Sequence, residues 1–141
     1  MKKLTLMLAA ISLAGCATQA ILPSKAKPVP VDRIYQYQNR TDQNNSTLIV
    51  VRDSGMVGSA CYATIYINGG RVAKLETQEK ATFFLPSGEW SIGTNLEGRG
   101  LCSAPNDRQE RYISLKNGES KSVRIFTDGS GNMDIKPTTL N

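Results

Sequence analysis

From residue 47 onward, short apolar runs alternate with turn residues, which is the pattern of β-strands rather than helices. Several runs are rich in β-branched and aromatic residues, and Asn68-Gly69 is a strong signal for a two-residue hairpin turn. The expected strands are residues 47–52, 61–67, 71–75, 81–85, 89–94, 111–115, 122–126 and 133–136. The pattern predicts an all-β fold, a small antiparallel β-sandwich of about seven to eight short strands.

The alternation within each run also predicts which side chains face the core. The expected core residues are Ile49, Val51, Ile65, Ile67, Val72, Phe84, Trp90, Ile92, Ile113, Val123, Ile125 and Phe126.

The N-terminus has a different pattern. Lys2 and Lys3 precede an apolar run at 4–13, which is too short to span a bilayer, since a spanning helix needs about 20 residues. The run ends in Leu13-Ala14-Gly15-Cys16, which resembles the lipobox of bacterial lipoproteins. The resemblance implies cleavage after residues 1–15 and lipidation of Cys16. An ordinary secretory signal followed by a chance cysteine is the alternative.

Ala17 follows the expected lipidation site. By resemblance to the sorting of enteric lipoproteins, this residue favours the outer membrane, with the domain facing the periplasm. Residues 16–45 contain Pro23, Pro28 and Pro30, so we expect a lipidated N-terminus and an extended tether there, with 31–38 packing as a first strand or short helix. The β-sandwich domain is expected at 46–141.

Composition narrows the classes of function. The chain of 141 residues has a net charge of +5, but two of its lysines lie in the expected signal, and no basic stripe with aromatics appears, so nucleic acid is not an expected partner. There is no histidine, which removes the commonest general base and every triad that needs one. We therefore expect a non-enzymatic protein without metal or cofactor, although a paired-carboxylate hydrolase stays open.

The three cysteines divide into one anchor and one pair. With Cys16 lipidated, Cys61 and Cys102 are expected to form a disulfide in an oxidising compartment. The bridge would close a loop of about 40 residues and stabilise the domain by roughly 4 kcal/mol. A redox or metal site is the alternative, but the chain lacks a CxxC motif.

Two loops, 53–59 and 95–108, are the best candidates for binding, because the disulfide would bring them together and loops on a rigid scaffold often carry function. The candidate contact residues are Arg52, Asp53, Met56, Arg99, Leu101 and Arg108. The alternative is that both loops are only connections.

The stretch from Ile65 through the Asn68-Gly69 turn to Pro86-Ser87-Gly88-Glu89-Trp90 resembles PEGA-like and DUF2846-like envelope modules. That resemblance implies a transthyretin-like β-sandwich and no catalytic residues. The expected function is a lipid-anchored periplasmic module that binds an envelope protein or assists an envelope assembly. The alternative is a periplasmic inhibitor of a lysozyme-like hydrolase. The sequence leaves the oligomeric state open.

Overall fold

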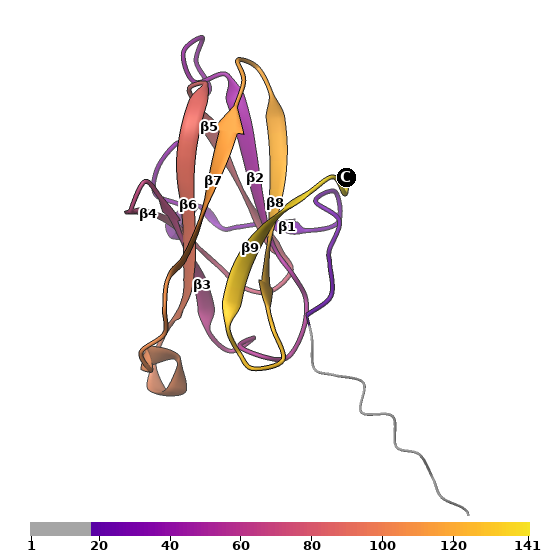
Figure 1. Cartoon of the computed structure of the whole chain (residues 1–141), viewed down its shortest axis with the longest axis vertical. Helices are drawn as coiled ribbons and strands as arrows, with labels where there is room; N and C mark the ends of the chain where they lie inside the picture. The colour runs from indigo at the N-terminus through magenta and orange to yellow at the C-terminus, as the bar shows by residue number, and fades with distance from the viewer. Residues whose placement is uncertain (1–17) are drawn as a thin grey trace, which may run out of the picture.

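The computed structural model describes residues 18–141, which form two stacked β-sheets (Figure 1). The expected signal peptide and Cys16 lie outside the described residues. All eight predicted strands are present, and the prediction of a small all-β sandwich is confirmed. Their bounds are β2 (Ser46–Arg52), β3 (Tyr62–Ile67), β4 (Gly70–Leu75), β5 (Glu79–Leu85), β6 (Gly88–Glu97), β7 (Gln109–Leu115), β8 (Ser120–Thr127) and β9 (Met133–Thr138).

Three short elements complete the described chain. They are the two-residue strand β1 (Lys27–Pro28) and two 3-10 helices, η1 (Val31–Arg33) and η2 (Gly100–Ser103). One sheet has the order β1-β5-β2-β8-β9 and the other β4-β3-β6-β7. Most neighbours are antiparallel, but β2 pairs with β8 and β1 with β5 in parallel. Period-two patterning does not distinguish these directions, because it is the same in both kinds of pair.

The core lies between the sheets. Its largest fully buried side chains include Phe83, Leu48, Ile65, Ile92 and Ile125. In β2 and β5 the predicted phase was partly wrong: Leu48 and Phe83 belong to the core cluster, whereas Ile49 and Phe84 are only half-buried. Both faces of these strands carry apolar residues, so alternation alone could not select the inner face.

The segment expected to be a flexible tether instead lies along the sandwich from Thr18 onward. Its backbone bonds to several strands: Lys27 N donates to Gln78 O at 2.9 Å, and Tyr35 N donates to Val72 O at 2.8 Å. Arg33 forms a two-point ion pair with Glu79, with both N–O distances 2.7 Å. The partners are distant in sequence, so a proline-rich composition gave no sign of them. The expectation that 31–38 packs on the domain agrees with η1.

Candidate functional site

The two predicted loops meet at one end of the sandwich. Cys61 directly precedes β3, Cys102 lies in η2, and they form the predicted disulfide with their Cα atoms 5.3 Å apart. The β8–β9 turn lies at the same end, the lower end in Figure 1. We call this region, residues 53–61, 98–108 and 128–132, the disulfide end.

Arg52 is buried, contrary to the prediction that it contacts a partner. Its side chain is 2% exposed and points between the sheets. The guanidinium donates to the carbonyl oxygens of Cys61 at 2.6 Å, Leu75 at 2.7 Å and Gly58 at 2.8 Å. Burial lowers the pKa of Arg52 to about 10, so the group stays charged at neutral pH. Arg52 thus joins β2 to β3 and β4.

Asp53 is also inaccessible, with 1% exposure. Its carboxylate accepts two hydrogen bonds from Arg124, including one from Nε at 2.9 Å. The hydroxyl of Thr18 lies 3.4 Å from the same carboxylate and accepts a hydrogen bond from Thr127 N at 3.2 Å. Asp53 therefore holds the N-terminal segment and β8 together, and the prediction that it contacts a partner was wrong.

The other four candidate residues reach the surface of the disulfide end. Met56 is 87% exposed and Leu101 is 95% exposed, while Arg99 is exposed beside Leu101. Arg108 already has intramolecular partners. Its guanidinium lies 4.6 Å from the centre of the Tyr66 ring, and its Nε lies 3.2 Å from a Glu110 oxygen. Met56, Arg99 and Leu101 remain available for contact.

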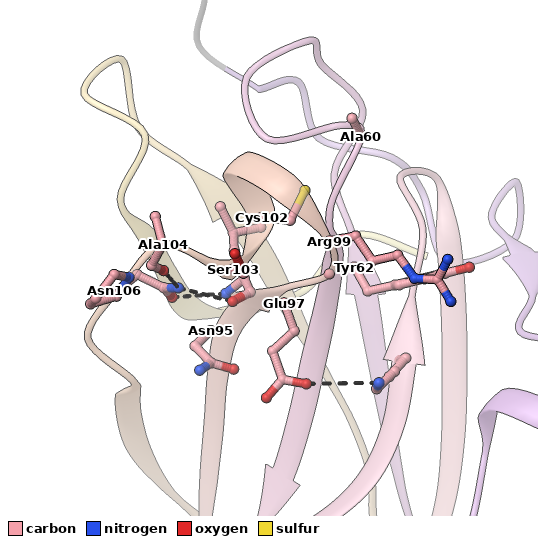
Figure 2. A pocket seen from close by; sticks show the side chains of 13 residues that line it. Ala60, Tyr62, Asn95, Glu97, Arg99, Cys102, Ser103, Ala104 and Asn106 are labelled. Atoms are coloured by element: carbon pink, nitrogen blue, oxygen red, sulfur yellow. Dashed lines mark hydrogen bonds and ion pairs between the residues drawn. The ribbon is translucent and has the colours of Figure 1, made fainter.

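A polar cleft opens between the η2 loop and the outer face of the four-stranded sheet. Figure 2 shows Cys102 and Ser103 of the loop above Asn95 and Glu97 of β6. The cleft has a volume of about 760 Å³. Its polar side chains include one carboxylate, two cations, a phenol and two amides: Glu97, Lys74, Arg99, Tyr62, Asn95 and Asn106. Such a mixture suits a polar or charged peptide segment better than an apolar ligand.

Besides the disulfide, two features hold the loop over the cleft in place: hydrogen bonds from Asn106 and a close approach at Gly98. The Asn106 side chain accepts from Leu96 N at 3.0 Å and donates to Leu96 O at 2.9 Å, which joins the loop to β6. At Gly98 a Cβ would lie 2.7 Å from Cys102 Cβ, so only glycine fits there. Asn106 could not be predicted from the sequence, because no local pattern distinguishes it from other loop asparagines.

Glu97, the carboxylate of the cleft, has several charged and polar partners. It accepts from Tyr66 Oη at 2.8 Å and Arg71 at 2.5 Å, and Lys74 Nζ lies 3.8 Å away. Desolvation would raise the pKa of Glu97, but the Tyr66 hydrogen bond and the positive charges of Arg71 and Lys74 outweigh it and lower the pKa. Glu97 is therefore an ionised acceptor near neutral pH.

Within residues 18–141, no group of three or more His, Cys, Asp or Glu residues could hold a metal ion. The Asp128 carboxylate is used by its own turn, where it accepts from Ser130 N at 2.9 Å and Asn132 N at 3.0 Å. In the same part of the chain, no helix has the length and apolar character needed to cross a membrane.

Comparison of the chain with protein-family models and with curated proteins finds no match. The residues of the disulfide end and the N-terminal motif are therefore the features of this chain that bear on its function.

Proposed function

We propose that this chain is a non-enzymatic bacterial lipoprotein, anchored at Cys16 in the outer membrane, whose sandwich binds another envelope protein on the periplasmic side. The lipobox Leu13-Ala14-Gly15-Cys16 supports the anchor. The resemblance to PEGA-like and DUF2846-like modules belongs to the same proposal, because such modules are small envelope sandwiches.

The observation that carries the binding proposal is the polar cleft, which presents Lys74, Glu97 and Arg99 on a braced frame. Fixed side chains lose little freedom on binding, so a rigid rim with both signs of charge favours specific recognition of a protein segment. The Arg99 side chain is the most exposed charged group of the cleft and is therefore the best residue to test.

The absence of histidine from the whole sequence supports a role without catalysis. Glu97 forms ion pairs, Asp53 is enclosed by Arg124, and Asp128 caps a turn. Each of these three carboxylates is held by a structural partner. A carboxylate held in this way is poorly placed to exchange protons with a substrate as a general acid or base.

Photo-cross-linking in intact cells tests the binding proposal. A photoreactive residue at Asn95 is expected to give one stoichiometric envelope protein adduct, whereas the same residue at Ser87, in the turn at the opposite end, is expected to give none. Arg99→Glu is expected to abolish the adduct, and Lys116→Glu, also at the opposite end, to leave it unchanged. An adduct that survives Arg99→Glu would exclude the surface around Arg99 as the binding site.

One feature favours the second candidate, a periplasmic inhibitor of a lysozyme-like hydrolase. The η2 loop presents Arg99 and the almost fully exposed Leu101 next to the disulfide, as a group that could block a catalytic cleft. Inhibition of a lysozyme by the mature protein, lost in Arg99→Glu, would favour this function over assembly.

A further inference from the structure

The described chain enters the sandwich immediately after the expected anchor. Gln19 and Ser54 exchange two backbone hydrogen bonds, of 2.8 and 3.0 Å. At Gly55 a Cβ would lie 2.9 Å from Thr18 Cα, so the two backbones are in close contact. Together with the Thr18 contacts to Asp53 and Thr127, these bonds fix residues 18 and 19 at the disulfide end.

This attachment limits how far the domain can stand from the anchor. Only Ala17 lies between Cys16 and Thr18, and two extended residue steps span at most about 7 Å. If Cys16 carries lipid, as the proposed function requires, its backbone lies at the membrane surface. The disulfide end must then lie next to the bilayer.

Two large apolar side chains are strongly exposed at the disulfide end. They are Met56 and Leu101. Met56 follows Gly55, the residue in contact with Thr18, and Leu101 precedes Cys102, whose disulfide joins it to the Met56 loop. Both loops therefore lie at the end of the sandwich where Thr18 is held, the lower end in Figure 1.

We propose that the disulfide end is a membrane-docking surface, with Met56 and Leu101 inserted among the lipid headgroups. This inference rests on the proposed lipid anchor. Two such side chains would bind a bilayer only weakly by themselves, but the anchor keeps them continuously at the surface, where a weak contact is enough to orient the domain. The polar cleft then opens sideways, close to the membrane, where a membrane-bound partner can reach it.

The charges at this end indicate that the docking is apolar rather than electrostatic. Arg99 and Arg108 are exposed cations at this end, and Asp107 and Asp128 are exposed carboxylates that balance them. The patch has no excess of positive charge to attract anionic lipids. Docking should therefore depend little on the fraction of anionic lipid or on salt.

Quenching of tryptophan fluorescence by brominated lipids tests the proposal on the mature lipidated chain in vesicles of phosphatidylethanolamine and phosphatidylglycerol. Met56→Trp and Leu101→Trp are expected to be quenched strongly, equally so in vesicles of phosphatidylcholine. The control is Tyr112→Trp, at a position on β7 that is 74% exposed and away from the disulfide end. The native Trp90, half-buried toward the opposite end, gives the background signal.

Flotation of the same vesicles separates the two proposals. Co-flotation with quenching at 56 and 101 no greater than at 112 would leave the anchor intact and overturn the docking. A chain that does not float with the vesicles would overturn the anchor and the docking together. A blue-shifted emission at 56 or 101 without quenching by brominated lipid would indicate contact with a second copy of the chain and would also overturn the docking.

Discussion

Arg52 closes the disulfide end of the sandwich from the inside. Its guanidinium donates to three backbone carbonyls, a buried one of Leu75 and two partly buried ones of Gly58 and Cys61. A buried acceptor left without a donor costs roughly 1–3 kcal/mol. The charge of Arg52 therefore serves to hold the β2–β3 loop and the end of β4 in place.

Arg52→Met is expected to lower the free energy of unfolding by about 3 kcal/mol, because a side chain of similar length fills the space without donating to the carbonyls. Arg52→Lys is expected to rescue little, since a single ammonium lacks the planar fork of donors. Urea denaturation measures both. The control is Arg71→Met, which removes a surface ion pair and is expected to cost less than about 1 kcal/mol. Equal effects at both positions would contradict the role of Arg52.

The lowered pKa of Glu97 predicts that the stability of the fold depends on pH. Its pKa is lowered in the folded state, so the ionised carboxylate stabilises the fold above its unfolded pKa, and this contribution is lost as pH falls through the folded pKa. Glu97→Gln is expected to be less stable than wild type at neutral pH, and the difference should narrow below about pH 4.3. Thermal unfolding from pH 3 to 7 measures it, with the exposed Glu89→Gln as control.

Arg52 and Asp53 also illustrate what a single sequence cannot say about a site. Both follow an apolar run and precede a glycine-rich loop, which is the usual pattern of exposed loop residues. Their partners, among them Leu75 and Arg124, are remote in sequence, so burial could not be predicted. Met56 and Leu101 are exposed, so their predicted role as contact residues stays a prediction.

At the scale of elements, the strands could be predicted because their signals are local. Turn dipeptides such as Asn68-Gly69 mark where strands end, and β-branched runs mark where they continue. The pairing of β2 with β8 could not be predicted, because it joins Val50 to Val123 across most of the domain. Cys61 and Cys102 were an exception among long-range contacts, since only one pairing was left once Cys16 was assigned to lipid.

The disulfide joins β3 to the η2 loop, and its loss should affect both stability and the cleft. The double variant Cys61→Ser, Cys102→Ser is expected to unfold about 4 kcal/mol more easily, since the bridge closes a loop of 41 residues in sequence separation. The photo-cross-link from Asn95 should weaken in the same variant. Denaturation in urea gives the first quantity. Ser103→Ala, which removes one hydrogen bond within the exposed loop, is the control and should behave like wild type.

At the scale of the whole molecule, the important feature is that the sandwich has no free tether within the described residues. Prolines and lysines made residues 16–45 resemble a spacer, but Val29 belongs to the core and Arg33 pairs with Glu79. The domain is therefore expected to stand on the membrane with a fixed orientation. With the proposed anchor at Cys16, its opposite end, with the turns at 86–88 and 116–119, would point toward the periplasm.

This geometry predicts the effect of lengthening the connection. Insertion of about 12 Gly and Ser residues after Ala17 would extend the reach between Cys16 and Thr18 from about 7 Å to roughly 20 Å. Flotation should be unchanged, because the lipid is intact. Quenching of Met56→Trp by brominated lipid should fall strongly, because the local concentration of the bilayer at Met56 and Leu101 drops. The same insertion after Asn141 should change neither measurement. Undiminished quenching in the first variant would mean that the disulfide end binds lipid independently of the short connection.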